Sequence, residues 1–228
     1  MRAPLNTKAR KLKGAPRDPA RTQERILAAA LNEFATHGFA GARVDAIARG
    51  ARINKRMLYH YFGDKKGLFR EVLRRKIAQR ASWVSSSPDD PSESLPYWFD
   101  LARQDLDWIR LLEWEALQVG NGKVTDEKAR RAASALAVDN IRRRQDGGHL
   151  LHELDARHLL LAMISLTSYA LAFPQVARLV TGLSPDGPKF RKERTQFLRR
   201  LGARLRPGDD SAIEFRARRL IPSASKNP

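Results

Sequence analysis

Cysteine is absent from the 228-residue sequence, which excludes both a disulfide framework and a thiolate metal site. A reducing cytoplasm is therefore the expected compartment. Long hydrophobic runs are also missing. The longest apolar stretch, residues 159–173, is interrupted by Ser165, Thr167 and Ser168 and is followed by Pro174. This stretch is too short to span a membrane and predicts a buried helix.

Sequence signatures of the common enzyme classes are missing as well. There is no Gly-rich phosphate loop, no nucleophile elbow, and no carboxylate pair beyond what a charged helical surface gives. His149, His152 and His158 lie around a glycine turn, but their spacing matches no common zinc pattern. We therefore expect no catalytic site, no metal site and no cofactor. The first residues carry charge with no apolar stretch after them, so no secretion signal is expected.

Acidic residues are scarce in the first third of the chain. Residues 1–80 hold 20 lysines and arginines against 6 acids, whereas residues 81–228 hold 23 against 19. Most of the formal net charge of +18 is therefore near the N-terminus. This imbalance predicts a polyanion-binding module joined to a more neutral domain. A membrane surface is the competing polyanion, but the basic residues lie on short helices that need their apolar faces for their own core, which favours DNA.

The basic third contains a pattern typical of a helix-turn-helix. Val44, Ile47 and Ala48 have helical spacing, and a second helical set begins at Ile53, with about four residues between the two helices. Asn54 is a suitable N-cap for the second helix, because its side-chain oxygen can accept a free backbone N–H. Burying the apolar faces leaves donors and aromatic rings facing outward, which suits a DNA groove. This outward set comprises Lys55, Arg56, Tyr59, His60 and Tyr61.

Residues 22–72 resemble the DNA-binding domain of the TetR family, a group of bacterial transcriptional regulators that are mostly repressors. The motifs that carry the resemblance are Thr22–Ala30, Phe34, Gly38-Phe39, Val44–Ala48, Leu58–Phe62, Lys65 and Leu68-Phe69. The resemblance implies an all-α fold. In this fold an N-terminal three-helix helix-turn-helix domain is followed by a helical-bundle domain for ligand binding and dimerisation.

The resemblance also implies which side chains contact DNA. Tyr59, Tyr61 and Lys65 match family positions that commonly hold phosphates, and such contacts set register without reading sequence. Arg56 can pair bidentately with guanine at a groove edge, which favours a guanine in each half-site. For Lys55, contact with a base or a phosphate is favoured over the alternative of a positive side chain that only faces solvent.

Two other positions of this surface stay open. His60 could contact either bases or phosphates. Met57 lies one turn after Ile53, so it belongs either to the core or to the DNA surface.

Several positions depart from the family pattern. Small hydroxyl residues usually precede Val44, and one of them caps the helix and touches phosphate; Arg43 weakens that cap but could supply a longer charged contact. Arg52 occupies a turn position where glycine is usual, so the turn either avoids a positive φ or accepts strain. Arg56 and Met57 replace the small and hydroxyl residues common at the start of the recognition helix, which predicts a different base preference.

Composition and turn signals divide the chain into four parts. Residues 1–21 form a basic arm that cannot fold alone, and they serve either as a solvated tail or as an arm that contacts phosphates or the minor groove. Residues 22–84 form the DNA-binding domain, including a linking fourth helix capped by Asp64. Residues 85–206 form the second domain, and Asp90 begins it in a pattern that resembles a capping box. Residues 207–228 are a charged tail.

Helical spacing and breakers set the expected helices. The first runs from near Asp18 or Thr22 to His37, where Gly38 would close it, and the fourth ends at about Trp83. The helices of the second domain are expected at 91–105, 106–118, 126–145, 155–181 with a break at Pro174, and 188–206.

Trp98, Trp108 and Trp114 fall close together in the second domain. Aromatic residues at helical spacing are usually core. The same rings could instead line a cavity for a small-molecule effector, which the resemblance implies, with binding that loosens the hold on DNA. Nearby acids would favour a cationic effector, although a solvated acidic face is the commoner explanation for them.

Residues 159–171 are apolar nearly all round and must be covered on more than one side. The resemblance implies that this helix and residues 188–205 pair with their mates in a four-helix dimer interface. A core helix in a monomer is the alternative. A two-fold dimer would read a palindromic operator on double-stranded DNA.

The leading hypothesis is therefore a homodimeric, sequence-specific repressor released from its operator by an effector. A non-specific architectural DNA-binding protein with the same fold is the alternative, since Arg43, Arg52 and Arg56 add positive charge to the surface. An enzyme is not expected.

Overall fold

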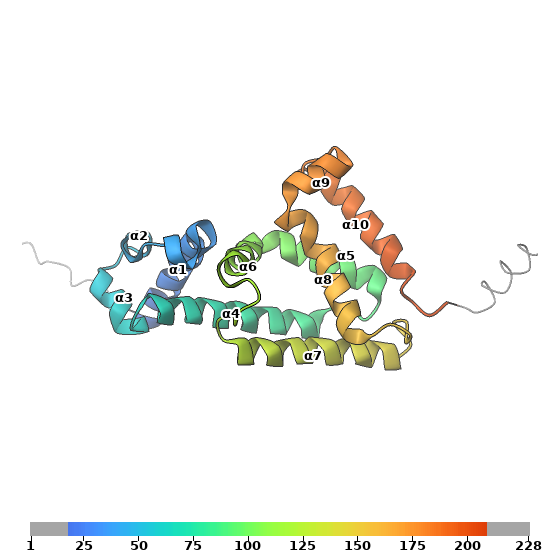
Figure 1. Ribbon diagram of the computed structural model, residues 1–228, viewed down its shortest axis with the longest axis horizontal. Helices are drawn as coiled ribbons and strands as arrows, with labels where there is room; N and C mark the ends of the chain where they lie inside the picture. The colour runs from blue at the N-terminus through green and yellow to red at the C-terminus, as the bar shows by residue number, and fades with distance from the viewer. Residues whose placement is uncertain (1–17, 209–228) are drawn as a thin grey trace, which may run out of the picture.

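The computed structural model describes residues 18–208, which form ten helices and no strand (Figure 1). The predicted all-α fold is confirmed. The helices are α1 (Pro19–Gly41), α2 (Val44–Gly50), α3 (Lys55–Phe62), α4 (Lys65–Ser86), α5 (Pro91–Gln104), α6 (Leu106–Val119), α7 (Glu127–Asp146), α8 (Ala156–Ala172), α9 (Pro174–Thr181) and α10 (Pro188–Ala203). Most of the basic arm and of the charged tail lies outside the described residues.

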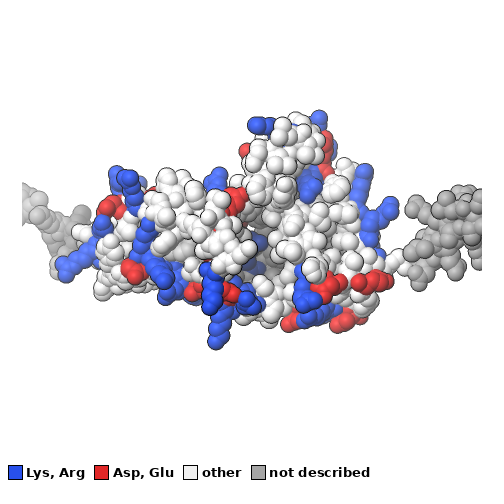
Figure 2. All heavy atoms as spheres, in the orientation of Figure 1, with Lys and Arg blue, Asp and Glu red and all other residues white. Residues whose placement is uncertain are grey.

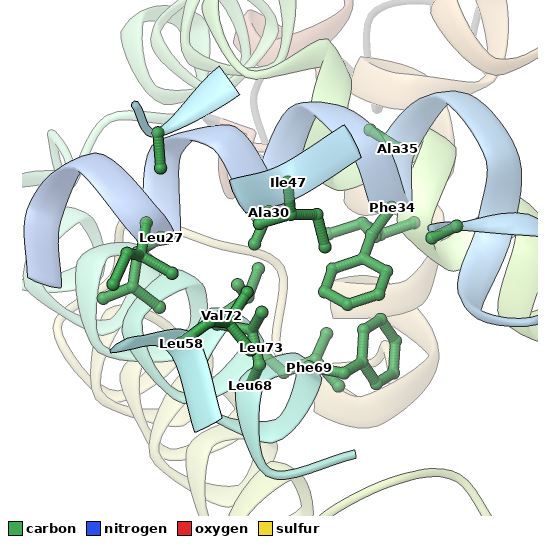
Figure 3. Packing of buried hydrophobic residues seen from close by; sticks show 14 residues of the cluster. Leu27, Ala30, Phe34, Ala35, Ile47, Leu58, Leu68, Phe69, Val72 and Leu73 are labelled. Carbon is green, nitrogen blue, oxygen red and sulfur yellow. The ribbon is translucent and has the colours of Figure 1, made fainter. Parts of the chain in front are cut away.

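Helices α1 to α4 share one hydrophobic core (Figure 3). Phe34 of α1 is fully buried, and its ring meets the ring of Phe69 of α4 edge to face at 4.9 Å between centroids. Leu58, the one fully buried residue of α3, reaches the same core. Because α3 is only eight residues long, this anchor and its neighbours hold the helix in place far more than helix propensity does.

Helix α4 connects the N-terminal domain to the rest of the molecule, and α7 lies alongside it (Figure 1). The junction after α4 is fixed by Arg144 of α7, whose side chain is only 2% exposed. Its guanidinium donates to the carbonyl of Ser87 at 3.1 Å and lies 3.3 Å from the carboxylate of Asp89. Burial lowers the pKa of Arg144, and Asp89 acts against that shift. The end of α4 is therefore tied to α7 and to the start of α5.

The second hydrophobic core lies among α5, α7, α8, α9 and α10. Helices α5 and α10 cross very closely at Gly202, where an added Cβ would lie 2.2 Å from the carbonyl oxygen of Pro91. Phe99 of α5 and Leu198 of α10 are fully buried and belong to this core. The close crossing needs glycine because no side chain fits between the two backbones.

Helix α8 ends at Ala172, and the chain turns sharply into α9, which begins with Pro174. The two helices are bent by 90° at this break. Among the described residues no single helix is long and apolar enough to cross a membrane, and only this bent pair passes that test of length and composition. With α10, the pair forms a projection on one side of the molecule (Figure 1).

Several predicted helix starts are confirmed where a local cap sets them. The side chains of Asn54, Asp64 and Asp90 accept backbone N–H groups at the starts of α3, α4 and α5, at 2.9, 2.6 and 2.8 Å. The capping box expected at α5 does not form, because Asp90 accepts from the backbone N–H of Ser92 and the carboxylate of Glu93 accepts from Arg199 of α10.

Two details of the N-terminal domain differ from expectation. Gly38 has a positive φ of 67° as predicted for a closing glycine, but one further helical turn follows it, so α1 continues beyond His37 to Gly41 with a break. Arg52 has a φ of 53°, so the turn does not avoid the left-handed region. The alternative of a strained turn is the correct one.

Candidate DNA-binding site

The outward face of α3 is built by one cap and one buried anchor. Asn54 accepts from the backbone N–H of Arg56, so the helix begins at Lys55. Leu58 then points into the core, which turns the neighbouring positions away from it. Figure 2 shows lysine and arginine side chains around the end of the molecule formed by α2 and α3.

The structure brings the eight predicted DNA-contacting residues together on α3 and on the segments next to it. The exposed members are Arg43, Lys55, Arg56, Tyr59 and His60. The partly buried members are Met57, Tyr61 and Lys65. Tyr61 also packs against the first core, so only part of it is free for a phosphate.

Lys55 is paired with an acid on the preceding helix. Its Nζ lies 2.9 Å from a carboxylate oxygen of Asp45 on α2. The hydrogen bond to Asp45 raises the pKa of Lys55, so the amine stays charged. Lys55 therefore links α2 to α3, and a DNA contact by this side chain competes with Asp45.

Lys65 has a defined structural position as well. Its Nζ donates to the carbonyl of Ala40 at 3.2 Å and lies 5.0 Å from the ring centroid of Phe39. The ammonium group of Lys65 thus links the end of α1 to the start of α4. Only its remaining N–H groups are available for a phosphate.

Arg43 is the N-cap residue of α2, and in the described part of the chain its side chain makes no capping hydrogen bond. Its backbone N–H donates to the carboxylate of Glu33 at 2.9 Å. The weakened cap predicted from the sequence is confirmed, and the Glu33 carboxylate compensates by binding the backbone there. The Arg43 guanidinium is left exposed.

Arg25 of α1 is a residue that sequence reasoning missed. Its guanidinium donates to the carbonyl of Ala51 and to that of Arg52, the latter at 3.0 Å. These carbonyls lie in the turn between α2 and α3, so Arg25 stabilises the turn that sets the orientation of α3. No sequence signal marks this role, because the bond joins residues far apart in the chain.

The three tryptophans considered for an effector cavity have separate partners. Trp98 donates its indole N–H to the hydroxyl of Ser87 at 3.0 Å. Trp108 packs against the first core, and Trp114 donates to the carbonyl of Ala35 of α1 at 3.2 Å. Trp108 and Trp114 therefore lie where α6 meets the N-terminal domain, and their role in ligand binding stays a prediction.

A cavity of about 370 Å³ opens beside α3, between the N-terminal domain and the loop before α7. Its lining comprises Gln23, Tyr61, Phe62, Gly67, Arg70, Glu71, Arg74, Arg75 and Asp126. The charged groups largely neutralise one another: Glu71 accepts from both Arg74 and Arg75, and Arg70 lies 3.5 Å from Asp126. The hydrogen bonds from Arg74 and Arg75 lower the pKa of Glu71, and the bond from Arg74 is the largest cause.

Among the described residues, no group of histidine and acidic side chains could hold a metal ion.

Comparison with known proteins agrees with this arrangement. A family model described as bacterial regulatory proteins of the tetR family matches residues 26–72, and a tetracycline repressor-like C-terminal domain model matches residues 97–204. The HTH-type transcriptional repressor SCO4008 of Streptomyces coelicolor is 36% identical over 168 residues, which is 74% of this chain and 88% of that protein. The HTH-type transcriptional repressor NicS of Pseudomonas putida is 38% identical over 78 residues, covering 33% of this chain and 37% of that protein.

Solved structures show the same fold. SCO4942 of Streptomyces coelicolor, described as a transcriptional regulator, superimposes with a TM-score of 0.66 at 28% identity, covering 79% of this chain and 97% of that one. The regulator FadR of Bacillus subtilis, solved in complex with stearoyl-CoA, superimposes with a TM-score of 0.57 at 15% identity, covering 77% and 96%. The chain therefore belongs to the TetR family of bacterial regulatory proteins, as a DNA-binding transcriptional repressor.

Proposed function

We propose that this repressor reads a palindromic operator as a homodimer, with α3 of each protomer in the major groove. The observation that carries the proposal is the exposed face of α3, which presents Arg56, Tyr59 and His60 while Leu58 anchors the helix. Arg56 begins this face with an exposed guanidinium suited to a guanine edge. Arg43, Tyr59, Tyr61 and Lys65 would hold phosphates on either side, which fixes the register of the helix in the groove.

Dimerisation is supported by large apolar side chains left exposed on α8 and α10. Leu161 is 60% exposed, Ile164 49%, Tyr169 51% and Phe197 49%. Exposed apolar area of this kind favours a protein interface. A second copy is the fitting partner because a two-fold dimer places two recognition helices on two half-sites of a palindrome.

The second domain is proposed to bind a small-molecule effector that relieves repression. The domain comprises residues 85–206, and α4 joins it to the DNA-binding domain of residues 22–84. FadR, which has the same fold, was solved with stearoyl-CoA. An effector would act by binding one arrangement of the two domains more tightly than the other, which shifts the population away from the DNA-binding state.

A non-specific DNA-binding role is the second candidate, favoured by the charge of the N-terminal third and by the exposed arginines at positions 43, 52 and 56. This role predicts a steep salt dependence with little discrimination between duplexes, because phosphate contacts release counterions without reading bases.

The experiment that separates the two is selection of bound duplexes from a random pool by the full-length protein at near-physiological salt. Enrichment of an inverted repeat is expected, and it would supply the operator for effector screens. Retained binding without enrichment would overturn sequence-specific reading in favour of the architectural role. The Arg56→Ala variant, taken through the same selection, is the matched control for readout by α3.

A further inference from the structure

Helix α6 of the second domain contacts α1 where α1 is broken. The break is at Gly38, whose φ of 67° and ψ of 175° are not helical. The indole N–H of Trp114 donates to the carbonyl of Ala35, one turn before the break. The chain beyond the break makes one more helical turn and then enters α2, so the geometry at Gly38 helps to set where α2 and α3 lie.

The Trp114 ring also fills the space over Gly38. A Cβ added to Gly38 would lie 2.9 Å from Cδ2 of the indole and 3.0 Å from Cε3, closer than real Cβ contacts. Both the positive φ and this contact require glycine at the position. Trp114 therefore bonds one side of the break and packs on the residue at its centre.

Side chains of α4 and α7 also contact the same helix. The guanidinium groups of Arg80 and Arg130 both lie over the Trp108 ring, with their central carbons 5.5 and 5.7 Å from the ring centroid. Arg130 of α7 pairs with the buried carboxylate of Glu115 at 2.5 Å. Helix α6 also packs against α8 as well as α1, so a displacement in the second domain can reach α1 through it.

The start of α6 is bonded to the linking helix. Asp105 is 6% exposed and pairs with Lys76 of α4, and Arg80 lies 3.8 Å from its other carboxylate oxygen. Burial lowers the pKa of Arg80, and the charge of Asp105 opposes that shift. The domains are thus joined covalently through α4 and also by packing that runs through α6 and Trp114 to α1.

We propose that Trp114 is a positioning residue that sets the orientation of the recognition helix through the break at Gly38. The inference rests on the proposed operator-reading function and adds a residue that governs it. A shift of α6 would move the indole, change the angle of the chain at Gly38, and thereby change the separation of the two α3 helices in a dimer. The separation of the half-sites that the dimer prefers is then a direct readout of this contact.

The test measures affinity for a series of duplexes in which the two half-sites of the selected operator are moved together or apart by single base pairs. Full-length wild type, Trp114→Phe and Trp114→Ala are compared, with Leu117→Ala on the same helix, where Leu117 is 79% exposed, as the control, and thermal stability is measured for each. Trp114→Phe keeps a ring over Gly38 but removes the donor to Ala35. It is the milder change and keeps the test decisive if Trp114→Ala fails to fold.

Wild type and Leu117→Ala are expected to prefer one spacing. Trp114→Ala should lose at least about fivefold of that discrimination while still binding DNA, as expected for a coupling between domains. Trp114→Phe should fall between. Folded variants that keep the wild-type spacing preference and differ only in melting temperature would overturn the inference, since Trp114 would then be merely structural. Absence of any enriched operator for wild type is a different result, which would defeat the proposed function itself.

Discussion

Arg52 has a backbone conformation that is unfavourable for a residue with a side chain. Its φ of 53° lies in the left-handed region, where an L side chain costs roughly 1–2 kcal/mol. Arg25 offsets this cost by donating to the carbonyls of Ala51 and Arg52. The turn between α2 and α3 is therefore held by a bond from α1 rather than by the glycine that the family pattern favours.

Replacing Arg52 by glycine is expected to raise the free energy of unfolding by up to about 1 kcal/mol, because glycine adopts this φ without a Cβ clash. Chemical denaturation of the two proteins measures the difference. Arg49→Gly is the matched control: it removes the same charge from the end of α2 at a helical position, and it should destabilise by up to about 1 kcal/mol. Equal destabilisation by both changes would contradict strain at Arg52.

Arg56 and Lys65 are expected to behave differently on substitution. Arg56→Ala should cost about 1–3 kcal/mol of discrimination at one base position of the operator, because it removes a base-edge contact. Lys65→Ala should weaken binding to all duplexes alike and also lower stability, since Lys65 donates to Ala40. Titrations of operator and random duplexes, together with thermal unfolding, measure both effects. If the two variants lost specific and random binding in the same proportion, base readout by Arg56 would be excluded.

At the scale of elements, the sequence predicts what local chemistry determines. The starts of α3, α4 and α5 follow from Asn54, Asp64 and Asp90, whose side chains bond to nearby backbone groups. The break before α9 follows from Pro174 in the same way. Local signals such as these need no knowledge of the remaining chain.

Contacts between distant residues could not be predicted in that way. The bond from Arg25 to the α2–α3 turn and the bond from Trp114 to Ala35 join different helices, and only packing brings their partners together. The outward face of α3 was predictable because it follows from helical period and one buried anchor, Leu58. The surroundings of Lys55 and Lys65, each already bonded within the protein, were not.

The crossing of α5 and α10 gives a prediction at this scale. Gly202→Ala places a Cβ 2.2 Å from the Pro91 carbonyl oxygen if nothing moves, so the two helices must separate. Overpacking of this kind costs about 1–3 kcal/mol of stability. Differential scanning calorimetry measures the change, with Gly208→Ala as the control because an added Cβ there meets no atom of residues 18–208 within 4 Å. A Gly202→Ala protein as stable as wild type would show that the crossing can relax at no cost.

At the scale of the whole molecule, the basic DNA-binding end and the apolar faces of α8 and α10 lie in different parts of the fold (Figure 1, Figure 2). In the proposed dimer, DNA binding and association of the two copies would use separate surfaces. The dimer would connect them, because it would set the distance between two recognition helices. A change on α8 should accordingly alter operator binding without touching DNA.

Leu161→Asp puts a charge on the exposed face of α8, where Leu161 is 60% exposed, so folding of the protomer should be little affected. Burying that charge in an interface is unfavourable, so the variant is expected to be monomeric by analytical ultracentrifugation. Its operator affinity should fall by at least about tenfold at concentrations where wild type is dimeric, because each protomer then holds one half-site alone. Leu136→Asp is the matched control on α7, with 64% exposure and the same change in charge. If Leu161→Asp remained dimeric, or if both variants dissociated equally, α8 would not be the face that joins the two copies.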